Sequence, residues 1–181
     1  DATLWFNNCT FIDGSINSEH QPNQTQYIPH VYINNCEFRE VQPLIIASHV
    51  LHSVMLGVGS GELVVRNSTF QGADIEMPSK GIVAASSVVD ISASSFTGLG
   101  SSAIYTWCWY NVPENISRTT VSKCSFVSGN IADPSPGSDL VHLMGETVID
   151  SCEFIQNTIT ESSPNSLLNT DGNATITRCL F

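Results

Sequence analysis

Apolar residues recur along the chain in short alternating runs that repeat every 26 to 32 residues. Positions five and seven residues before a repeated phenylalanine are mostly apolar, as Phe6 and Leu4 are before Phe11. Seven of the eight phenylalanines belong to this series: Phe11, Phe38, Phe70, Phe96, Phe126, Phe154 and Phe181. Side chains two apart on a strand share one face, so each pair of positions points to the same side. Self-similarity at this period indicates a solenoid.

The position two residues before each phenylalanine is always small. It holds Cys9, Cys36, Ser68, Ser94, Cys124, Cys152 and Cys179, so five of the six cysteines share it. We expect these cysteines and the seven phenylalanines to form continuous core ladders. The spacing of stacked strands lies within the Cα range of a disulfide, but parallel side chains aim poorly at each other. We therefore favour buried thiols that pack as small apolar groups over disulfides.

In each repeat, the first inward pair (Leu4 and Phe6) and the second (Cys9 and Phe11) are offset by three positions, from Phe6 to Cys9. This odd spacing breaks the alternation of a single strand. Such a break places two successive residues toward water and predicts a corner, as at Asn7-Asn8 and Asn34-Asn35. Asparagine tolerates the unusual backbone angles that a corner needs.

A second short strand is expected after each phenylalanine, once a loop of variable length has passed. The candidates are 44–47, 82–85, 103–106, 140–143 and 167–170, which are too short for helices and rich in β-branched residues. Each repeat is then one turn of an all-β, right-handed parallel β-helix of about six coils, a single unit over residues 1–181.

A leucine-rich-repeat solenoid is the alternative fold. The run Leu4-x-Phe6-x-x-Cys9-x-Phe11 also fits the centre of that motif. Against it, the leading leucine is missing, phenylalanine closes every repeat, and the return segments lack a helical pattern.

Charge removes several classes of partner. Six Lys and Arg against 17 Asp and Glu give a net charge of −11, which disfavours binding to nucleic acid or anionic lipid. The chain has no apolar run long enough to insert in a membrane. It also lacks the spacing of a metal or cofactor motif, so we expect neither.

The repeats resemble right-handed parallel β-helix proteins of the pectin-lyase-like class. Phe126-x-x-x-Asn130, Phe154-x-x-Asn157 and Gly100-Ser101-Ser102-Ala103-Ile104-Tyr105 are also similar to the F-x-x-N and G-G-A-I repeats of polymorphic outer-membrane adhesins. The resemblance implies an elongated secreted or surface module, either a polysaccharide-active enzyme or an adhesive or fibrous scaffold.

Catalytic residues of such enzymes would be carboxylates grouped on adjacent coils. Asn169-Thr170-Asp171-Gly172 resembles an N-T-D segment of polygalacturonases, but Asp-Gly is also an ordinary turn signal, which we favour. If the second strands are in register, Tyr105, His142 and Asn169 form a column that either faces a ligand or makes contacts between coils. We assign no catalytic residue.

Aromatic residues cluster after the fourth repeat, at Tyr105, Trp107, Trp109 and Tyr110. If exposed, they could stack on sugar rings or contact a protein. If buried, they anchor the following loop.

Five N-x-[ST] sequons fall on predicted corners or loops: Asn8, Asn23, Asn67, Asn115 and Asn173. They are candidate N-glycosylation sites if the source is eukaryotic.

Both ends of the sequence carry a complete core strand pattern and no polar cap. An uncapped solenoid exposes unpaired backbone and apolar side chains. We therefore expect the segment to continue into other coils or to stack on other subunits. The function expected is a non-catalytic, extracellular or cell-surface structural or adhesive module of a fibre, adhesin or appendage. The alternatives are a polysaccharide lyase or hydrolase and a carbohydrate-binding module.

Overall fold

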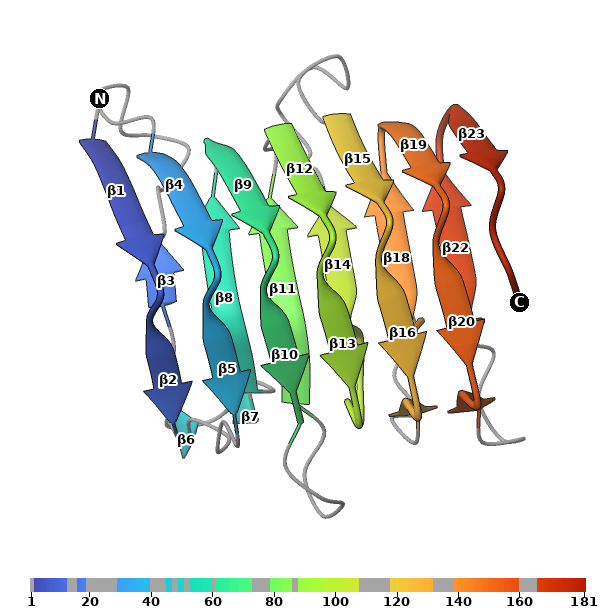
Figure 1. Cartoon of the computed structure of the whole chain (residues 1–181), viewed down its shortest axis with the longest axis horizontal. Coiled ribbons are helices and arrows are strands. Elements are labelled where there is room, and N and C mark those ends of the chain that lie inside the picture. The colour runs from blue at the N-terminus through green and yellow to red at the C-terminus, as the bar shows by residue number, and fades with distance from the viewer. Residues whose placement is uncertain are drawn as a thin grey trace.

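The computed structural model of the protein describes residues 2–12, 16–18, 29–39, 45–46, 49–50, 53–59, 61–72, 79–85, 88–107, 118–131, 139–159 and 166–181. Within these ranges every regular element is a β-strand. Three long parallel sheets account for most of them (Figure 1).

Sheet A has seven strands in the order of the chain. They are β1 (Ala2–Asn7), β4 (Pro29–Asn34), β9 (Glu62–Arg66), β12 (Val88–Ser92), β15 (Arg118–Ser122), β19 (Glu146–Asp150) and β23 (Ala174–Thr177). Sheet B follows each of the first six strands. It consists of β2 (Thr10–Ile12), β5 (Glu37–Arg39), β10 (Thr69–Gln71), β13 (Ser95–Thr97), β16 (Ser125–Val127) and β20 (Glu153–Ile155).

Sheet C contains the return strands. They are β3 (Ile16–Ser18), β8 (Ser53–Gly59), β11 (Ser79–Ala85), β14 (Ile104–Trp107), β18 (Val141–Met144) and β22 (Leu168–Asp171). Two small sheets pair β17 (Asn130–Ile131) with β21 (Thr158–Ile159), and β6 (Ile45–Ile46) with β7 (His49–Val50).

One strand from each long sheet makes one coil, which gives six complete coils. We number them 1 to 6 from β1, and the partial coil that β23 begins is coil 7. In Figure 1 the near strands run downward and the far strands run upward while the chain advances from left to right, which makes the winding right-handed. The predicted parallel β-helix is therefore confirmed. The leucine-rich-repeat alternative is wrong, because the described return segments are strands that pair in parallel.

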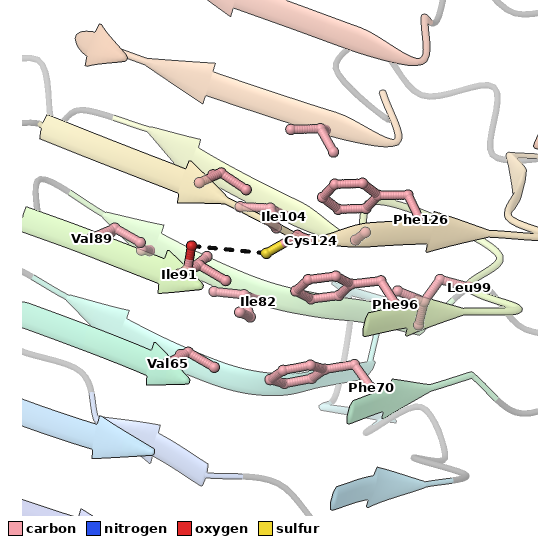
Figure 2. Close-up of a cluster of buried hydrophobic side chains, with 14 of the residues drawn as sticks. Val65, Phe70, Ile82, Val89, Ile91, Phe96, Leu99, Ile104, Cys124 and Phe126 are labelled. Carbon is pink, nitrogen blue, oxygen red and sulfur yellow. Dashed lines mark hydrogen bonds between the residues drawn. The ribbon is translucent and has the colours of Figure 1, made fainter. Parts of the chain in front are cut away.

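Aromatic stacking connects the coils inside this frame. The seven ladder phenylalanines stack ring on ring, with centroids 4.6–5.1 Å apart and planes within 16°. Figure 2 shows three of them, Phe70, Phe96 and Phe126, in line beside the inward residues of sheet A. The rings in the middle of the ladder are at most 2% exposed. Coils therefore bury their apolar faces against one another, as the repeat predicted.

The predicted corner between sheets A and B is present in every coil. Its second residue always has a positive φ of 48° to 55°: Asn8, Asn35, Asn67, Ala93, Lys123, Ser151 and Arg178. This left-handed conformation strains residues other than Gly, Asn and Asp. The corner is therefore fixed by register rather than by residue preference in coils 4 to 7.

One predicted return strand is wrong. Residues 44–47 were expected to return coil 2, but β8 does so, and Ile45–Ile46 pairs antiparallel with His49–Val50. Leu44 and Ala47 lie outside the described residues. Two apolar runs compete in this coil, and only β8 has the length to pair with both β3 and β11. The other four predicted return strands coincide with β11, β14, β18 and β22: β11 starts three residues before its prediction, and the other three start one residue after theirs.

Candidate functional site

Exposed apolar side chains gather on the two terminal coils. Leu4, Trp5 and Ile12 of coil 1 are 41%, 65% and 63% exposed. At the other end, Ile176, Leu180 and Phe181 are 45%, 59% and 62% exposed. The equivalents of Ile176 and Phe181 in the middle coils are buried to within a few per cent. Leu4, Ile176 and Phe181 are thus core positions that are exposed on the end coils, whereas Trp5, Ile12 and Leu180 are outward positions.

The outermost described strands of sheet A lie at the same two ends. β1 and β23 are the outer strands of sheet A, and each pairs with a single neighbour among the described strands. An edge strand carries N–H and C=O groups that accept another strand. Apolar contact and strand pairing therefore coincide at both ends.

A polar and aromatic cluster lies on the outer face of sheet A. The Trp5 indole stacks on Tyr32 with centroids 4.1 Å apart and planes at 12°. Tyr32 Oη donates a 2.7 Å hydrogen bond to Glu62 Oε2, which also lies 3.0 Å from His30 Nδ1. The hydrogen bond from Tyr32 lowers the pKa of Glu62, and the same contact raises the pKa of Tyr32.

This cluster was not predicted. Trp5 occupies the outward position between Leu4 and Phe6, and only Tyr32 repeats it as an aromatic. The parity of the strand could have signalled an outward tryptophan.

Two of the predicted aromatic residues lie on the outer face of sheet C. Tyr105 stacks on His142 with centroids 4.9 Å apart, and Lys80 Nζ lies 4.8 Å from the centroid of the Tyr105 ring. Both partners contact the ring, so Tyr105 is already engaged in packing between coils. Trp107 follows on the same face and is half-buried. Trp109 and Tyr110 lie outside the described residues.

The predicted column of Tyr105, His142 and Asn169 is in register. Its centre is Asp139, a buried residue that the sequence did not single out. The Asp139 carboxylate lies 2.9 Å from His142 Nδ1 and accepts a 2.9 Å bond from Asn169 Nδ2. It also accepts bonds from the Ser166 amide and hydroxyl, at 2.6 and 2.8 Å. Burial opposes the charge, but these partners prevail and lower the pKa of Asp139.

Asp171 lies at the edge of this cluster. It ends β22 beside Gly172, whose φ is 142°, in the turn that the Asp-Gly pair predicted. Its Oδ2 is 3.5 Å from His142 Nε2 and its side chain is 56% exposed. Asp139 is buried and committed to its own donors, so the two carboxylates are not equally open to a substrate. The cluster therefore has the character of a structural junction between coils 5 and 6.

The described cysteines lie in their predicted column. Cys9, Cys36, Cys124, Cys152 and Cys179 are free thiols. Each lies within 3.3–3.5 Å of the carbonyl oxygen two residues earlier. Ser68 and Ser94 make the same bond at 2.8 and 2.9 Å. The position therefore selects a small side chain that donates to its own corner. Cys108 lies outside the described residues.

Three of the predicted sequons can be located. Asn8 and Asn67 occupy the same corner in coils 1 and 3, Asn173 precedes β23, and all three are exposed. Asn67 Nδ2 donates to Asn34 Oδ1 at 3.3 Å. Asn23 and Asn115 lie outside the described residues.

Among the described residues, no group of three or more His, Cys, Asp and Glu side chains is arranged to hold a metal ion. The same residues include no helix of the length and hydropathy that a membrane crossing requires.

Comparisons with family models, with curated proteins and with solved structures give no match for this chain.

Proposed function

We propose that this chain is a non-catalytic structural or adhesive module of an extracellular fibre, adhesin or surface appendage, and that its end coils stack on other coils of the same kind. The observation that carries the proposal is the concentration of exposed apolar side chains on coils 1 and 7, among them the core positions Leu4, Ile176 and Phe181. Exposed sequons at Asn8, Asn67 and Asn173 accord with a secreted location.

Stacking would extend contacts that already join the coils. Within the chain, each added coil places a phenylalanine on a phenylalanine and pairs a further strand with sheet A. A further coil on β23 would cover Ile176 and Phe181 by the same contacts. Parallel strand pairing would act together with burial of these side chains. Burial contributes roughly 25 cal/mol for each Å² of apolar surface removed from water.

Light scattering over a range of protein concentrations tests this association. We expect the mass of the particles to rise with concentration for the parent chain and to fall to the monomer for Ile176→Lys/Phe181→Glu. Val88→Lys is the matched control, because Val88 is 43% exposed on an interior coil. A parent chain that stays monomeric while β1 and β23 are protected from hydrogen exchange would refute the proposal.

A carbohydrate-binding module is the second candidate, and Trp5 is the observation that favours it. Its ring is held by Tyr32 on one side, and the residue is 65% exposed. Aromatic faces of this kind stack on the C–H faces of sugars. The acidic chain would favour neutral sugars over acidic ones. Calorimetry with neutral and acidic oligosaccharides would use the parent, Trp5→Ala and Ile176→Lys/Phe181→Glu. A sugar site at Trp5 predicts that binding is lost in Trp5→Ala and retained in the double variant, which lies at the other end of the chain.

A further inference from the structure

The cysteine column places a half-exposed thiol beside a buried one at each end of the described rod. Cys9 and Cys179 are half-buried, whereas Cys36 and Cys152 are 2% and 0% exposed. In sheet A, Asn7 pairs with Asn34 and Asp150 pairs with Thr177. Each cysteine follows one of these residues by two positions, so Cys9 lies opposite Cys36 and Cys152 lies opposite Cys179. Oxidant can therefore reach one member of each pair, and its partner lies in the adjacent coil.

The spacing of the coils allows a bond between these partners. Neighbouring strands lie about 4.8 Å apart, inside the Cα range of disulfides. The Cβ atoms of aligned residues keep nearly the same spacing, which is slightly wider than the distance of about 3.8 Å that a disulfide prefers. The two coils must draw together to form the bond. Such a bond is strained and hence readily reduced.

We propose that Cys9–Cys36 and Cys152–Cys179 are oxidative modification sites, at which a low-molecular-weight disulfide converts each thiol pair into a reversible disulfide between adjacent coils. The exposed thiolate attacks one sulfur of oxidised glutathione, forms a mixed disulfide and releases one glutathione thiolate. The buried thiolate then attacks the protein sulfur of that mixed disulfide and releases the second glutathione. Each pair loses two protons and two electrons, and the electrons reduce the glutathione disulfide.

The two pairs differ in reactivity. Contact with Cys124 lowers the pKa of Cys152, whereas burial raises the pKa of Cys36. The thiolate is the nucleophile of exchange, so Cys152 resolves its mixed disulfide faster than Cys36 does. Cys124 is 2% exposed, and its sulfur is directed at the Ile91 carbonyl oxygen (Figure 2). Its neighbour in the cysteine column is Cys152, which is also buried. Oxidised glutathione therefore reaches Cys179 more easily than Cys124.

The chain itself supplies the control substitution. Ser68 and Ser94 fill the same column in coils 3 and 4 and bond to the same corner carbonyl position. Serine is therefore accommodated at Cys36, Cys124 and Cys152. The variants are Cys36→Ser, Cys152→Ser and, as the matched control, Cys124→Ser.

The experiment treats the folded chain with oxidised glutathione, quenches with an alkylating agent and assigns each linkage by peptide mass spectrometry. We expect Cys152–Cys179 to form first and Cys9–Cys36 second, with both bonds lost on adding reduced glutathione. Cys152→Ser should stop at a glutathione adduct on Cys179, Cys36→Ser at one on Cys9, and Cys124→Ser should retain both bonds.

Two results would overturn the inference. One is stable glutathione adducts on Cys9 and Cys179 of the parent chain with no bond between coils. The other is a principal linkage that joins Cys124 to Cys152, or Cys108 to either exposed thiol. The test reads covalent bonds within one chain rather than the mass of particles, so its failure is distinguishable from a failure of the proposed stacking.

Discussion

Phe96→Ala should destabilise the protein far more than the same change at Phe181. Phe96 is 2% exposed and stacks on two rings, with centroids 4.9 Å from Phe70 and 5.1 Å from Phe126. Removing a buried phenylalanine costs about 3–5 kcal/mol, which includes the cavity that remains. Phe181 has one stacked partner and is 62% exposed, so in proportion its removal should cost about 1–2 kcal/mol.

Urea unfolding followed by circular dichroism measures both losses, and Phe96→Leu controls for side-chain volume. Leucine keeps most of the packing, so this variant should lose less than about half of what Phe96→Ala loses. In a solenoid, stability is set by each repeat and its interfaces with its neighbours. Equal losses for Phe96→Ala and Phe181→Ala would show that the ladder does not carry the stability of the interior coils, and would refute the reasoning.

Three further predictions concern the corners and the polar junctions. Arg178 donates a 2.9 Å hydrogen bond to Asp150 and lowers the pKa of that carboxyl to about 2. The pair therefore stabilises the fold above the ordinary carboxyl pKa, and this contribution is lost as pH falls toward 2. In an NMR titration, the midpoint of Asp150 should move upward in Arg178→Ala, and an unchanged midpoint would contradict the assignment. Asp139→Ala should cost about 3–5 kcal/mol, because it removes the partner of the buried His142 and of the half-buried donors Ser166 and Asn169. Asp90→Ala, on the exposed face of sheet A, should cost under about 1 kcal/mol. Similar unfolding midpoints for the two variants would argue against a junction. Ala93 has a φ of 48°, so Ala93→Gly should stabilise the chain by about 0.5–1 kcal/mol in thermal unfolding, and a destabilised variant would show that the corner is not strained.

The features that could be predicted from sequence are those that every coil repeats. Phe11 to Phe181 fixed the register of sheets A and B, because a one-residue slip would turn each ring outward. The corner residue was also predictable, since the spacing of three recurs even where Ala93 or Lys123 replaces asparagine. Repetition averages out the ambiguity of any single short run.

Features that occur in a single coil were missed or misplaced. Residues 44–47 are as apolar as the true return strand, and nothing local distinguishes a strand that pairs with β3 and β11 from one that folds back on β7. Asp139 precedes β18 without a counterpart in the other repeats, and two of its three partners, Ser166 and Asn169, lie in the next coil. Trp5 faces outward at a position where most coils carry unremarkable residues.

The constant corner also makes the length of the rod adjustable in whole steps. Residues 94–123 form one repeat, from Ser94 in the cysteine column to Lys123, the residue before Cys124. Ala93 and Lys123 are equivalent corner residues, so removal of this repeat would join Ala93 to Cys124 at the same corner. The splice would restore the same turn and delete one rung of about 4.8 Å from the rod. Genetic duplication or loss of such a unit would lengthen or shorten the protein without a new fold. The length of the protein could therefore be fitted to a partner by the number of coils.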